Sequence, residues 1–398
     1  MTSSVPAFRL PTRVVLEPGC RRLLPERVAA CGAGGARSAA DAGSEALLVV
    51  DAGLAESPWT DEVRSSLEQQ GLRCRIFSGV ESNPRAGTVE ELAEVARRKR
   101  LSPVIAVGGG SVLDAAKAAA MLATNGGHCA DYEGAERFQE SPLPFIALPT
   151  TCGTGSEVTW VSVISQPERR VKISIKGHRM FPDHALVDAD FLRTLPAELV
   201  AWTALDALTH SLEAITGRLA NPASEALATR SVELLLAYLP RAAADIAGDD
   251  EAREAVMTAS TLAGMAFGNS DVGAVHCLSE TLGGGWDVPH GLANALLLVP
   301  VLRSHGDSIH AALARVARRA LPRSPEAVSD DDSEAASALL AAVKRLVDSL
   351  RLPPFADFAI PAEDYDWIAT QAAANGSNDS NPRPMTPAEY RAILDGLR

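Results

Sequence analysis

Short apolar runs alternate with helical patterns through the first half of the chain. Residues 45–51 and 103–110 are apolar, rich in β-branched side chains, and end on an aspartate or on glycines. Residues 144–151 repeat this pattern, whereas 88–100 and 111–123 carry apolar positions at helical spacing. Strand, helix and strand in this order predict a parallel, doubly wound sheet.

A different element is expected after the third of these strands. The segments "WVSVIS" (160–165) and "RVKISIK" (170–176) alternate apolar and polar residues around the polar turn "QPER". Alternation with a period of two on both sides of a turn predicts a β-hairpin.

The second half of the sequence is helical. Residues 196–216, 221–246 and 250–267 repeat apolar positions at a period near 3.6, and most of the remaining sequence follows the same pattern. We therefore predict an α/β domain over residues 1–195 and an all-helical domain over residues 196–398.

Two segments interrupt these patterns. Residues 31–46 are rich in Ala, Gly and Ser, and we expect a flexible surface insertion there. Residues 324–337 contain an acidic cluster, for which a solvated loop and a helix cap are the expected structures.

Composition and charge narrow the class of protein. The 398 residues carry 37 basic and 50 acidic side chains, a net charge of −13, which argues against nucleic acid and against an anionic membrane surface as partners. The six cysteines form no CxxC pair, and we expect reduced thiols in the cytoplasm. The N-terminus has no apolar signal core, and no apolar run reaches the roughly 18 residues of a membrane span.

Two loops offer a site for a nucleotide. Gly108, Gly109 and Gly110 stand between a predicted strand and a predicted helix, where backbone N–H groups can approach a pyrophosphate. A tight turn with Ser111 as the helix N-cap explains the same residues. The loop "LPTTCGTGSEVT" (148–159) offers hydroxyls and glycines for phosphate and ribose contacts, or a capped turn. Asp51 ends a strand, where it could bind a ribose hydroxyl or cap a turn.

A second set of residues could bind a metal ion. Asp206 and His210 are four residues apart, and on a helix they share one face. We expect the helix that His276 opens to be broken at "GGGWD" (283–287), so that the chain reverses and brings His290 beside His276. One aspartate and three histidines suit Fe²⁺ or Zn²⁺ better than Mg²⁺ or Ca²⁺. Each histidine taken singly is also consistent with a hydrogen-bonded structural residue.

The motifs together resemble a known family. "GGGSVLDAAK", "PTTCGTGSEVT", "DALTH", "VPHG" and "NPRPMT" follow one another as in the iron-containing (group III) alcohol dehydrogenases. The similarity extends from about residue 8 to residue 398. It implies a dinucleotide-binding α/β domain followed by an all-helical metal-binding domain, an architecture shared with dehydroquinate synthase. It also implies an NAD(H)-linked dehydrogenase of small alcohols or aldehydes that forms a homodimer or higher homo-oligomer.

The resemblance also implies roles for individual residues. Four of them match the metal ligands: Asp206, His210, His276 and His290. Eleven match cofactor contacts: Asp51, Asn83, Gly109, Gly110, Ser111, Asp114, Thr150, Thr151, Thr154, Thr159 and Lys172. Asp51 favours NAD over NADP. Phe267 and Val272 match positions that line the substrate pocket.

Glu280 departs from the family pattern. The best-known members carry a second histidine four residues after the third ligand, and this chain has Glu280 there. On a helix Glu280 shares a face with His276, so it could orient that ring, pass a proton or attract a cationic group of the substrate. An ordinary ion pair is the structural alternative. Glu280 and His276 are the candidate catalytic residues.

Other functions remain open at this point. A lyase of the dehydroquinate synthase type also uses NAD and a metal, but it needs a basic cluster for a phosphate substrate. Basic residues occur near the hairpin: Arg169, Arg170, Lys172, Lys176 and Arg179. They also allow an anionic substrate, such as a carboxylated or phosphonylated aldehyde. A non-catalytic metal- or nucleotide-binding protein is the third alternative, against which the complete ligand set argues.

Overall fold

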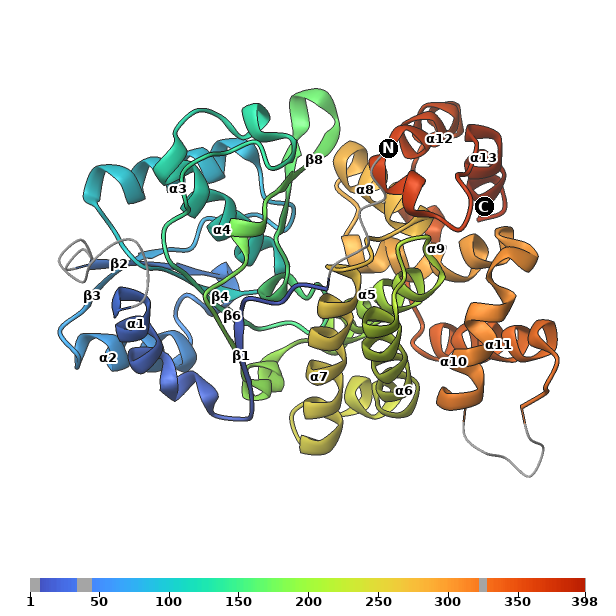
Figure 1. Cartoon of the computed structure of the whole chain (residues 1–398), viewed down its shortest axis with the longest axis horizontal. Coiled ribbons are helices and arrows are strands. Elements are labelled where there is room, and N and C mark those ends of the chain that lie inside the picture. Colours follow the sequence, from blue (N-terminus) through green and yellow to red (C-terminus); the bar gives the residue numbers. More distant parts are fainter. Residues whose placement is uncertain (1–7, 34–44, 322–327, 398) are drawn as a thin grey trace. The chain divides into compact units, whose positions relative to one another are not determined.

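The chain forms two compact units (Figure 1). The computed structural model describes residues 8–33, 45–321 and 328–397. One unit is Leu10–Leu195, and the other joins Pro196–Arg398 to the N-terminal segment that ends at Arg9. The N–H of Arg9 donates to Asn269 Oδ1 at 2.6 Å, and Asn269 Nδ2 donates to the Arg9 carbonyl at 3.1 Å. These two bonds place Arg9 with the helical unit and not with the α/β unit, where it was expected.

A six-stranded parallel sheet forms the centre of the first unit. Its strands follow the order β1-β9-β6-β4-β2-β3, and every pair in it is parallel. This arrangement confirms the expected sheet. The strands are β1 (Arg13–Leu16), β2 (Glu45–Val50), β3 (Arg73–Phe77), β4 (Val104–Gly108), β6 (Phe145–Pro149) and β9 (His184–Val187).

Helices cover both faces of this sheet, because its central strands are apolar on both sides. Leu47 and Val49 of β2 pack in one core with residues of two helices, α3 (Ala86–Lys99) and α4 (Gly110–Asn125). Leu48 and Val50 point the other way, into a second core with residues of α1 (Leu24–Ala33) and α2 (Pro58–Glu68). Each fully buried aliphatic side chain contributes about 1.5–3 kcal/mol.

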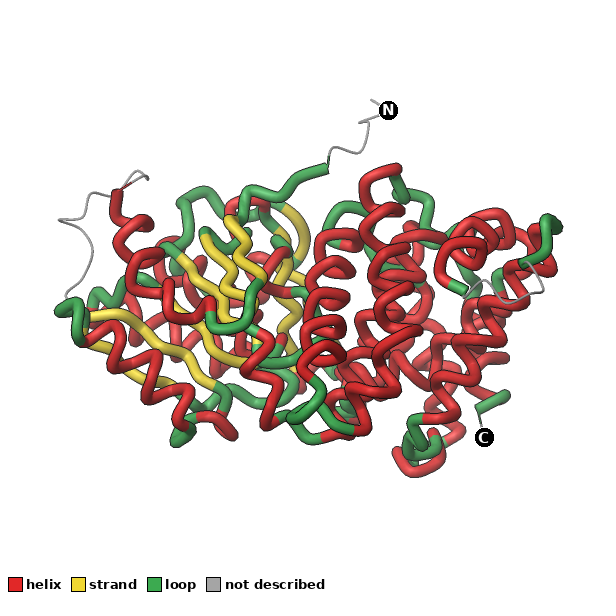
Figure 2. Tube along the Cα trace, turned by 90° about the horizontal axis from the view of Figure 1, so that it is seen from below, coloured by secondary structure: helices red, strands yellow, loops and turns green. Residues whose placement is uncertain are grey.

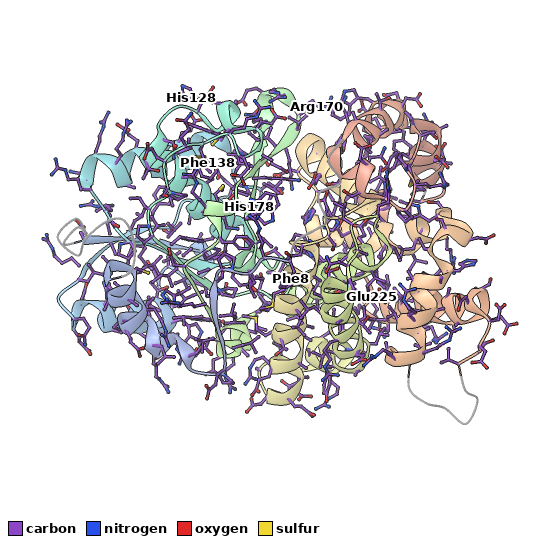
Figure 3. The ribbon with its side chains drawn as sticks, in the orientation of Figure 1. Phe8, His128, Phe138, Arg170, His178 and Glu225 are labelled. Atoms are coloured by element: carbon purple, nitrogen blue, oxygen red, sulfur yellow. The ribbon has the colours of Figure 1, made fainter. Side chains whose placement is uncertain are left out.

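The predicted hairpin is present in a second, three-stranded sheet. Strands β7 (Val161–Gln166) and β8 (Val171–Lys176) are antiparallel, and β5 (Gly134–Ala135) pairs with β8. Arg170 lies at the hairpin turn, in the left-handed region with φ 53° (Figure 3).

The second unit is helical, as expected, and the described strands all lie in the first unit (Figure 2). The prediction was confirmed for the first three of its helices within two residues at each end. Its helices are α5 (Ala197–Thr216), α6 (Pro222–Ala244), α7 (Asp250–Phe267), α8 (Ala274–Trp286), α9 (His290–Ser304), α10 (His310–Ala320), α11 (Asp332–Ser349), α12 (Tyr365–Ala374) and α13 (Pro387–Asp395).

One helix is longer than the sequence indicated. Helix α8 does not break at Gly283 but continues through the three glycines to Trp286. Glycine costs about 1 kcal/mol in a helix interior. Packing of α8 against α9 and α12 offsets this cost, and Leu278 and Leu282 are fully buried there. The helix ends where Asp287 turns left-handed with φ 56°.

The two irregular segments have different outcomes. Most of the Ala/Gly/Ser-rich segment, residues 34–44, lies outside the described residues, as does the start of the acidic one. The expected cap in the acidic segment is confirmed, because Asp331 accepts a hydrogen bond from the Glu334 N–H at the start of α11.

Across the described ranges, every helix is too short or too polar to cross a membrane.

Candidate metal centre and cofactor loops

Helix α5 carries three polar side chains along one buried face. Asp206, His210 and Glu213 are spaced four and then three residues apart, and none is more than 4% exposed. The other buried residues of α5 are aliphatic, apart from Thr209, Ser211 and Thr216, whose hydroxyls donate to carbonyls of the same helix. Ionisable groups in such surroundings require partners, because a buried charge without a partner costs several kcal/mol.

Three helices supply the partners of Asp206. His210 Nδ1, His276 Nε2 and His290 Nε2 each lie 3.8 Å from Asp206 Oδ1. The ligand atoms of Asp206, His276 and His290 all lie within 4.8 Å of one another. His210 lies beside this set, and its ring stacks on His276 with 4.5 Å between ring centroids. The structure therefore brings three of the four predicted ligands together and holds the fourth against the same carboxylate.

An amide lies at the centre of these acceptors. Asn294 Nδ2 donates to Asp206 Oδ1 at 2.6 Å and lies 3.2 Å from Nε2 of both His276 and His290. Asn294 Oδ1 is buried and has no hydrogen-bond partner. An N–H group among three acceptors, on an amide whose carbonyl is unsatisfied, marks a position that favours positive charge. The donor set therefore fits a divalent cation, and its imidazole nitrogens suit Fe²⁺ or Zn²⁺.

The electrostatics of Asp206 agree with this interpretation. Burial alone would raise the pKa of Asp206, but His210, His290, His276 and the Asn294 amide together hold its pKa below the ordinary value. Asp206 is thus kept as the carboxylate, which is the form that binds a metal.

Glu213 orients His276. Its Oε2 lies 2.5 Å from His276 Nδ1, and its Oε1 accepts the Val275 N–H at 2.7 Å. Because Nδ1 is committed to this carboxylate, Nε2 presents its lone pair towards Asp206. Burial opposes a charge on His276, but Glu213, Asp206 and Glu280 raise the pKa of this ring above its ordinary value.

The start of α8 is fixed from a distant part of the sequence. Asn381, in the late "NPRP" motif, accepts the Ala274 N–H through Oδ1 at 2.7 Å. Together with the bond from Glu213 to the Val275 N–H, this contact satisfies two of the free donors that every helix N-terminus leaves. His276 follows directly, so its position depends on both side chains.

A glycine allows α9 to approach α5. A methyl group added at Gly291 would lie 2.6 Å from the main-chain oxygen of Trp202 in α5. Only glycine fits at this separation without moving one of the helices. The close approach places His290, the first residue of α9, beside Asp206.

Glu280 does not have the two structural roles considered for it. It does not orient His276, because Glu213 occupies Nδ1. It also forms no ion pair with any basic group that the structure describes. Its partner is a neutral amide, since Asn375 Nδ2 donates to Glu280 Oε2 at 2.7 Å.

The two predicted pocket residues, Phe267 and Val272, precede His276 in the sequence. One of them, Phe267, also contacts a predicted ligand. Phe267, the last residue of α7, stacks on His210 with 4.1 Å between ring centroids. Val272 is half-buried in the connection between α7 and α8.

The candidate cofactor loops follow three neighbouring strands of the parallel sheet. Asp51 ends β2, Gly109 follows β4, and Thr150 follows β6. After β2 the chain adds β3 on one side of the sheet, and after β4 it adds β6 on the other side. The strand order therefore reverses between β2 and β4. Nucleotides bind at the carboxyl ends of strands where the order reverses in this way.

Close packing explains two of the glycines. A methyl group at Gly110 would lie 2.4 Å from Thr154 Cγ2, and one at Gly109 would lie 3.0 Å from Thr151 Cγ2. The N-cap of α4 is Gly109, which offers no side-chain cap. Ser111 was considered as that cap, and this alternative is wrong, because its hydroxyl donates to the carbonyl of Ser82. The N-terminus of α4 therefore keeps N–H donors and a positive dipole for an anion.

Asp51 and Asp114 differ in how many of their carboxylate oxygens accept hydrogen bonds from the protein. Asp51 Oδ1 accepts the Gly53 N–H at 2.9 Å, so the capping alternative holds for one of its oxygens. Both oxygens of Asp114 are engaged, by the Ser156 hydroxyl at 2.6 Å and the Val163 N–H at 2.9 Å. Asp114 thus fixes the loop after β6 onto α4, and burial raises its pKa.

A buried lysine holds the same loop. Lys117 Nζ donates to the carbonyl and the hydroxyl of Ser156, at 2.8 and 2.9 Å, and to the Val161 carbonyl at 2.8 Å. Thr159 Oγ1 lies 3.4 Å from the same nitrogen. Burial lowers the pKa of Lys117 to about 8. Lys117 of α4 therefore holds the loop that contains Thr151 and Thr154 in place.

The other predicted cofactor residues lie around this anchor. Asn83 is buried in the segment before α3, whose Pro84 carbonyl accepts the Ser165 N–H of β7 at 2.7 Å. Thr150 is buried, and its N–H donates to the Gly108 carbonyl at 3.0 Å. Lys172 is half-buried on β8, opposite Ser165.

Four residues that shape these sites were missed in the sequence. Glu213 had a readable signal, because it is seven residues after Asp206 and three after His210 on one helix face. Asn294 stands four residues after His290 and had a similar signal. Asn381 and Lys117 act through contacts between distant segments, which spacing does not reveal.

Comparison with known proteins covers both units. Residues 11–189 match the family described as iron-containing alcohol dehydrogenase, and residues 200–397 match the C-terminal region of the Fe-containing alcohol dehydrogenase family.

Two curated relatives span most of the chain. Alcohol dehydrogenase 4 of Schizosaccharomyces pombe is 34% identical over 351 residues, which is 87% of this chain and 81% of the relative. Choline dehydrogenase of Bacillus subtilis is 32% identical over 392 residues, 97% of this chain and 93% of the relative.

Two solved structures share the whole fold. The crystal structure of a 1,3-propanediol oxidoreductase matches with a TM-score of 0.91 and 33% identity, covering 98% of this chain and 99% of that one. Sulfoacetaldehyde reductase from Bifidobacterium kashiwanohense, in complex with NAD⁺, matches with a TM-score of 0.85 and 25% identity, covering 99% of each chain.

Proposed function

Since the chain belongs to the iron-containing alcohol dehydrogenase family, we propose that the residues gathered around Asp206 hold its metal ion and that its substrate is a small alcohol or aldehyde. Members of this family use NAD(H) and Fe²⁺, and the chain is an NAD-dependent alcohol dehydrogenase with the dehydroquinate synthase-like fold. The observation that carries the proposal is the convergence of ligand atoms from α5, α8 and α9 within 4.8 Å.

The proposed ligands divide the work of binding. Asp206 supplies the negative charge, while His276 and His290 supply neutral nitrogens from two other helices. His210, 3.8 Å from the same carboxylate, is the fourth proposed ligand. When bound, Fe²⁺ supplies a Lewis acid for the substrate oxygen, and NAD(H) supplies or accepts the hydride. Glu213 holds the proton of His276 at Nδ1, so Nε2 stays free to coordinate.

The cofactor is proposed to lie over the loops at the switch point of the sheet. The uncapped N–H groups at the start of α4 would receive its pyrophosphate, with Gly109, Gly110 and Ser111 in direct contact. Asp51 would accept from the ribose hydroxyls through the oxygen that Gly53 leaves, and it would repel a 2′-phosphate. The other contacts of this proposal are Asn83, Asp114, Thr150, Thr151, Thr154, Thr159 and Lys172.

The basic residues near the hairpin give little support to an anionic substrate. Arg169 donates to Glu133 Oε2 at 3.0 Å. Arg179 donates to the Phe138 and Gln139 carbonyls and lies over the Phe138 ring. Both guanidinium groups therefore stabilise their own unit. The same contacts engage two of the five basic residues that a lyase acting on a phosphate substrate could use.

The test of this function is net NADH consumption. Fe²⁺-reconstituted protein is mixed with NADH and a panel of neutral, carboxylated, phosphonylated and cationic aldehydes, with a chelator-treated sample beside it. We expect turnover that the chelator abolishes. We also expect Asp206→Asn to lose both turnover and the bound metal. Glu198→Gln, an exposed change on the same helix, is the matched control. Absence of turnover on every aldehyde, in protein shown to bind metal and NADH, would overturn the proposal.

The family's tendency to associate extends the proposal to a homodimer or higher homo-oligomer. Leu16 on edge strand β1 and Ile76 on edge strand β3 are 40% and 39% exposed, so each edge of the sheet carries a large apolar side chain at the surface. Sedimentation analysis gives the state directly, and a monomer at micromolar concentration would contradict this part.

A further inference from the structure

Glu280 is a carboxylate beside the metal centre that the protein itself does not neutralise. It is half-buried on α8, one helical turn after His276 and on the same face. In the part of the chain that the structure describes, no basic nitrogen lies within ion-pair distance of it. Other acidic groups around the centre have partners, since Glu213 is bound to His276 and Asp206 to three histidines and an amide.

The amide of Asn375 keeps this carboxylate in place without cancelling its charge. Asn375 ends α12, and its Oδ1 accepts the Ser377 N–H at 2.9 Å. That bond fixes the orientation of the amide, so that Nδ2 faces Glu280 Oε2 at 2.7 Å. This neutral N–H donor holds one oxygen of the carboxylate and adds no positive charge. The other oxygen has no hydrogen-bond partner among the described residues.

Two of the roles considered for Glu280 are therefore excluded, and the arrangement favours one of the remaining two. A carboxylate that a neutral donor holds in place, with no basic partner among the described residues, is well suited to attract a positive charge. Proton transfer through the other oxygen is the second remaining role, and it would affect a charged and a neutral substrate equally. A half-buried negative charge needs a counter-ion most when solvent is displaced from it, as happens when a substrate binds.

The separation of His276 and Glu280 on α8 determines how far the positive charge of a substrate should lie from its oxygen. Residues four apart on a helix have Cβ atoms about 5–6 Å apart. A substrate whose oxygen lies at the metal ligands would thus need its positive charge about two carbons away from that oxygen. Phe267, stacked on His210, adds an aromatic ring next to the same ligands, and aromatic rings attract alkylated ammonium groups.

We propose that Glu280 selects an alcohol or aldehyde that carries a fixed positive charge, of the quaternary ammonium type, about two carbons from the reacting oxygen. This inference rests on the proposed function and names the substrate class of the same site. Glu280 is a specificity-determining residue in it, which binds the charge of the substrate and takes no part in the transfer of hydride.

A pair of isosteric alcohols tests the proposal. Choline and 3,3-dimethyl-1-butanol have the same shape and differ only in the charge of the quaternary atom. We expect the ratio of kcat/KM for choline to that for the neutral alcohol to fall about tenfold or more in Glu280→Gln, which equals about 1.4 kcal/mol or more. The value for the neutral alcohol stays the same. Glu254→Gln, an exposed change on α7, is the control and leaves both values unchanged.

A binding measurement separates this inference from the proposed function. Tetramethylammonium cannot be oxidised at a hydroxyl, and its binding to the Fe²⁺- and NAD⁺-loaded protein is measured by calorimetry. We expect binding that weakens about tenfold in Glu280→Gln and falls with added salt. If no aldehyde of the panel is reduced but this binding depends on Glu280, the proposed function fails and the cation site stands. An unchanged choline ratio, or tetramethylammonium binding that is absent or equal in both proteins, overturns the inference.

Discussion

Replacing Glu213 by glutamine tests how the metal centre is built. The carboxylate accepts two buried N–H groups, from His276 Nδ1 at 2.5 Å and from Val275 at 2.7 Å. A glutamine of the same shape has one acceptor oxygen, so it can serve only one of these donors while its own N–H groups face the other. The change leaves a buried donor unsatisfied, which costs about 1–3 kcal/mol of stability.

The effect on metal binding is of similar size. Without the carboxylate, His276 loses the partner that fixes its tautomer and makes Nε2 a better donor. Changes of this kind cost about 10–100-fold in metal affinity, or about 1.4–2.8 kcal/mol. We expect Glu213→Gln to bind Fe²⁺ or Zn²⁺ more weakly by a factor in this range.

The assay is competition with a fluorescent chelator, together with thermal unfolding in the presence and absence of the metal. Metal should raise the unfolding temperature less in Glu213→Gln than in the native chain. Glu198→Gln, in the first turn of α5 and exposed, is the control that changes the charge of the same helix. A Glu213→Gln protein with native metal affinity would refute the reasoning, because His276 would then need no carboxylate to orient it.

Three further changes test the glycine contact, the buried lysine and the cofactor preference. In Gly291→Ala the new methyl group meets the Trp202 carbonyl, so unfolding temperature and metal affinity should both fall; Gly87→Ala, whose methyl meets nothing within 4 Å, should change neither. Burial lowers the pKa of Lys117 to about 8 from 10.5. The unfolded chain therefore holds more protons between these pH values, and stability should rise with pH there; urea unfolding of Lys117→Met should lose this rise, and an unchanged slope would contradict the assignment. Asp51→Ser should raise the kcat/KM ratio of NADPH to NADH about tenfold, and an unaltered ratio would place the ribose elsewhere.

The parallel sheet and the helical unit could be predicted because their signals are local. Strand β2 shows its character in five consecutive apolar residues, and α5 shows both its period and two residues of the metal set on one face. Such patterns depend on neighbours in the sequence alone. The convergence of His276 and His290 was expected from a chain reversal after a break at residues 283–287, and α8 does end there, although at Asp287 and not at the glycines.

The features that could not be predicted from the sequence depend on contacts between distant segments. The glycines of α8 predict a break by propensity, and only packing against α9 and α12 explains why the helix continues to Trp286. Glu280 and Glu213 are both carboxylates at helical spacing from a ligand. Spacing within α8 suggested Glu280 as the partner of His276, whereas the partner comes from another helix. The choice between them is made by how α5 and α8 pack.

The arrangement on α5 has a consequence for how this sequence can change in length. Asp206, His210 and Glu213 are set by a single uninterrupted helix, in which each residue turns the chain by about 100°. Insertion or deletion of one residue between Asp206 and Glu213 would rotate one of these side chains off the shared face, and no loop lies within the span to absorb the shift. The connection between α8 and α9 consists of the three residues from Asp287 to Pro289. A change of length there does not rotate the residues of one helix relative to one another. Length variants confined to connections are therefore expected to keep the centre, whereas single-residue variants between Asp206 and Glu213 should separate the side chains that lie on the two sides of the change.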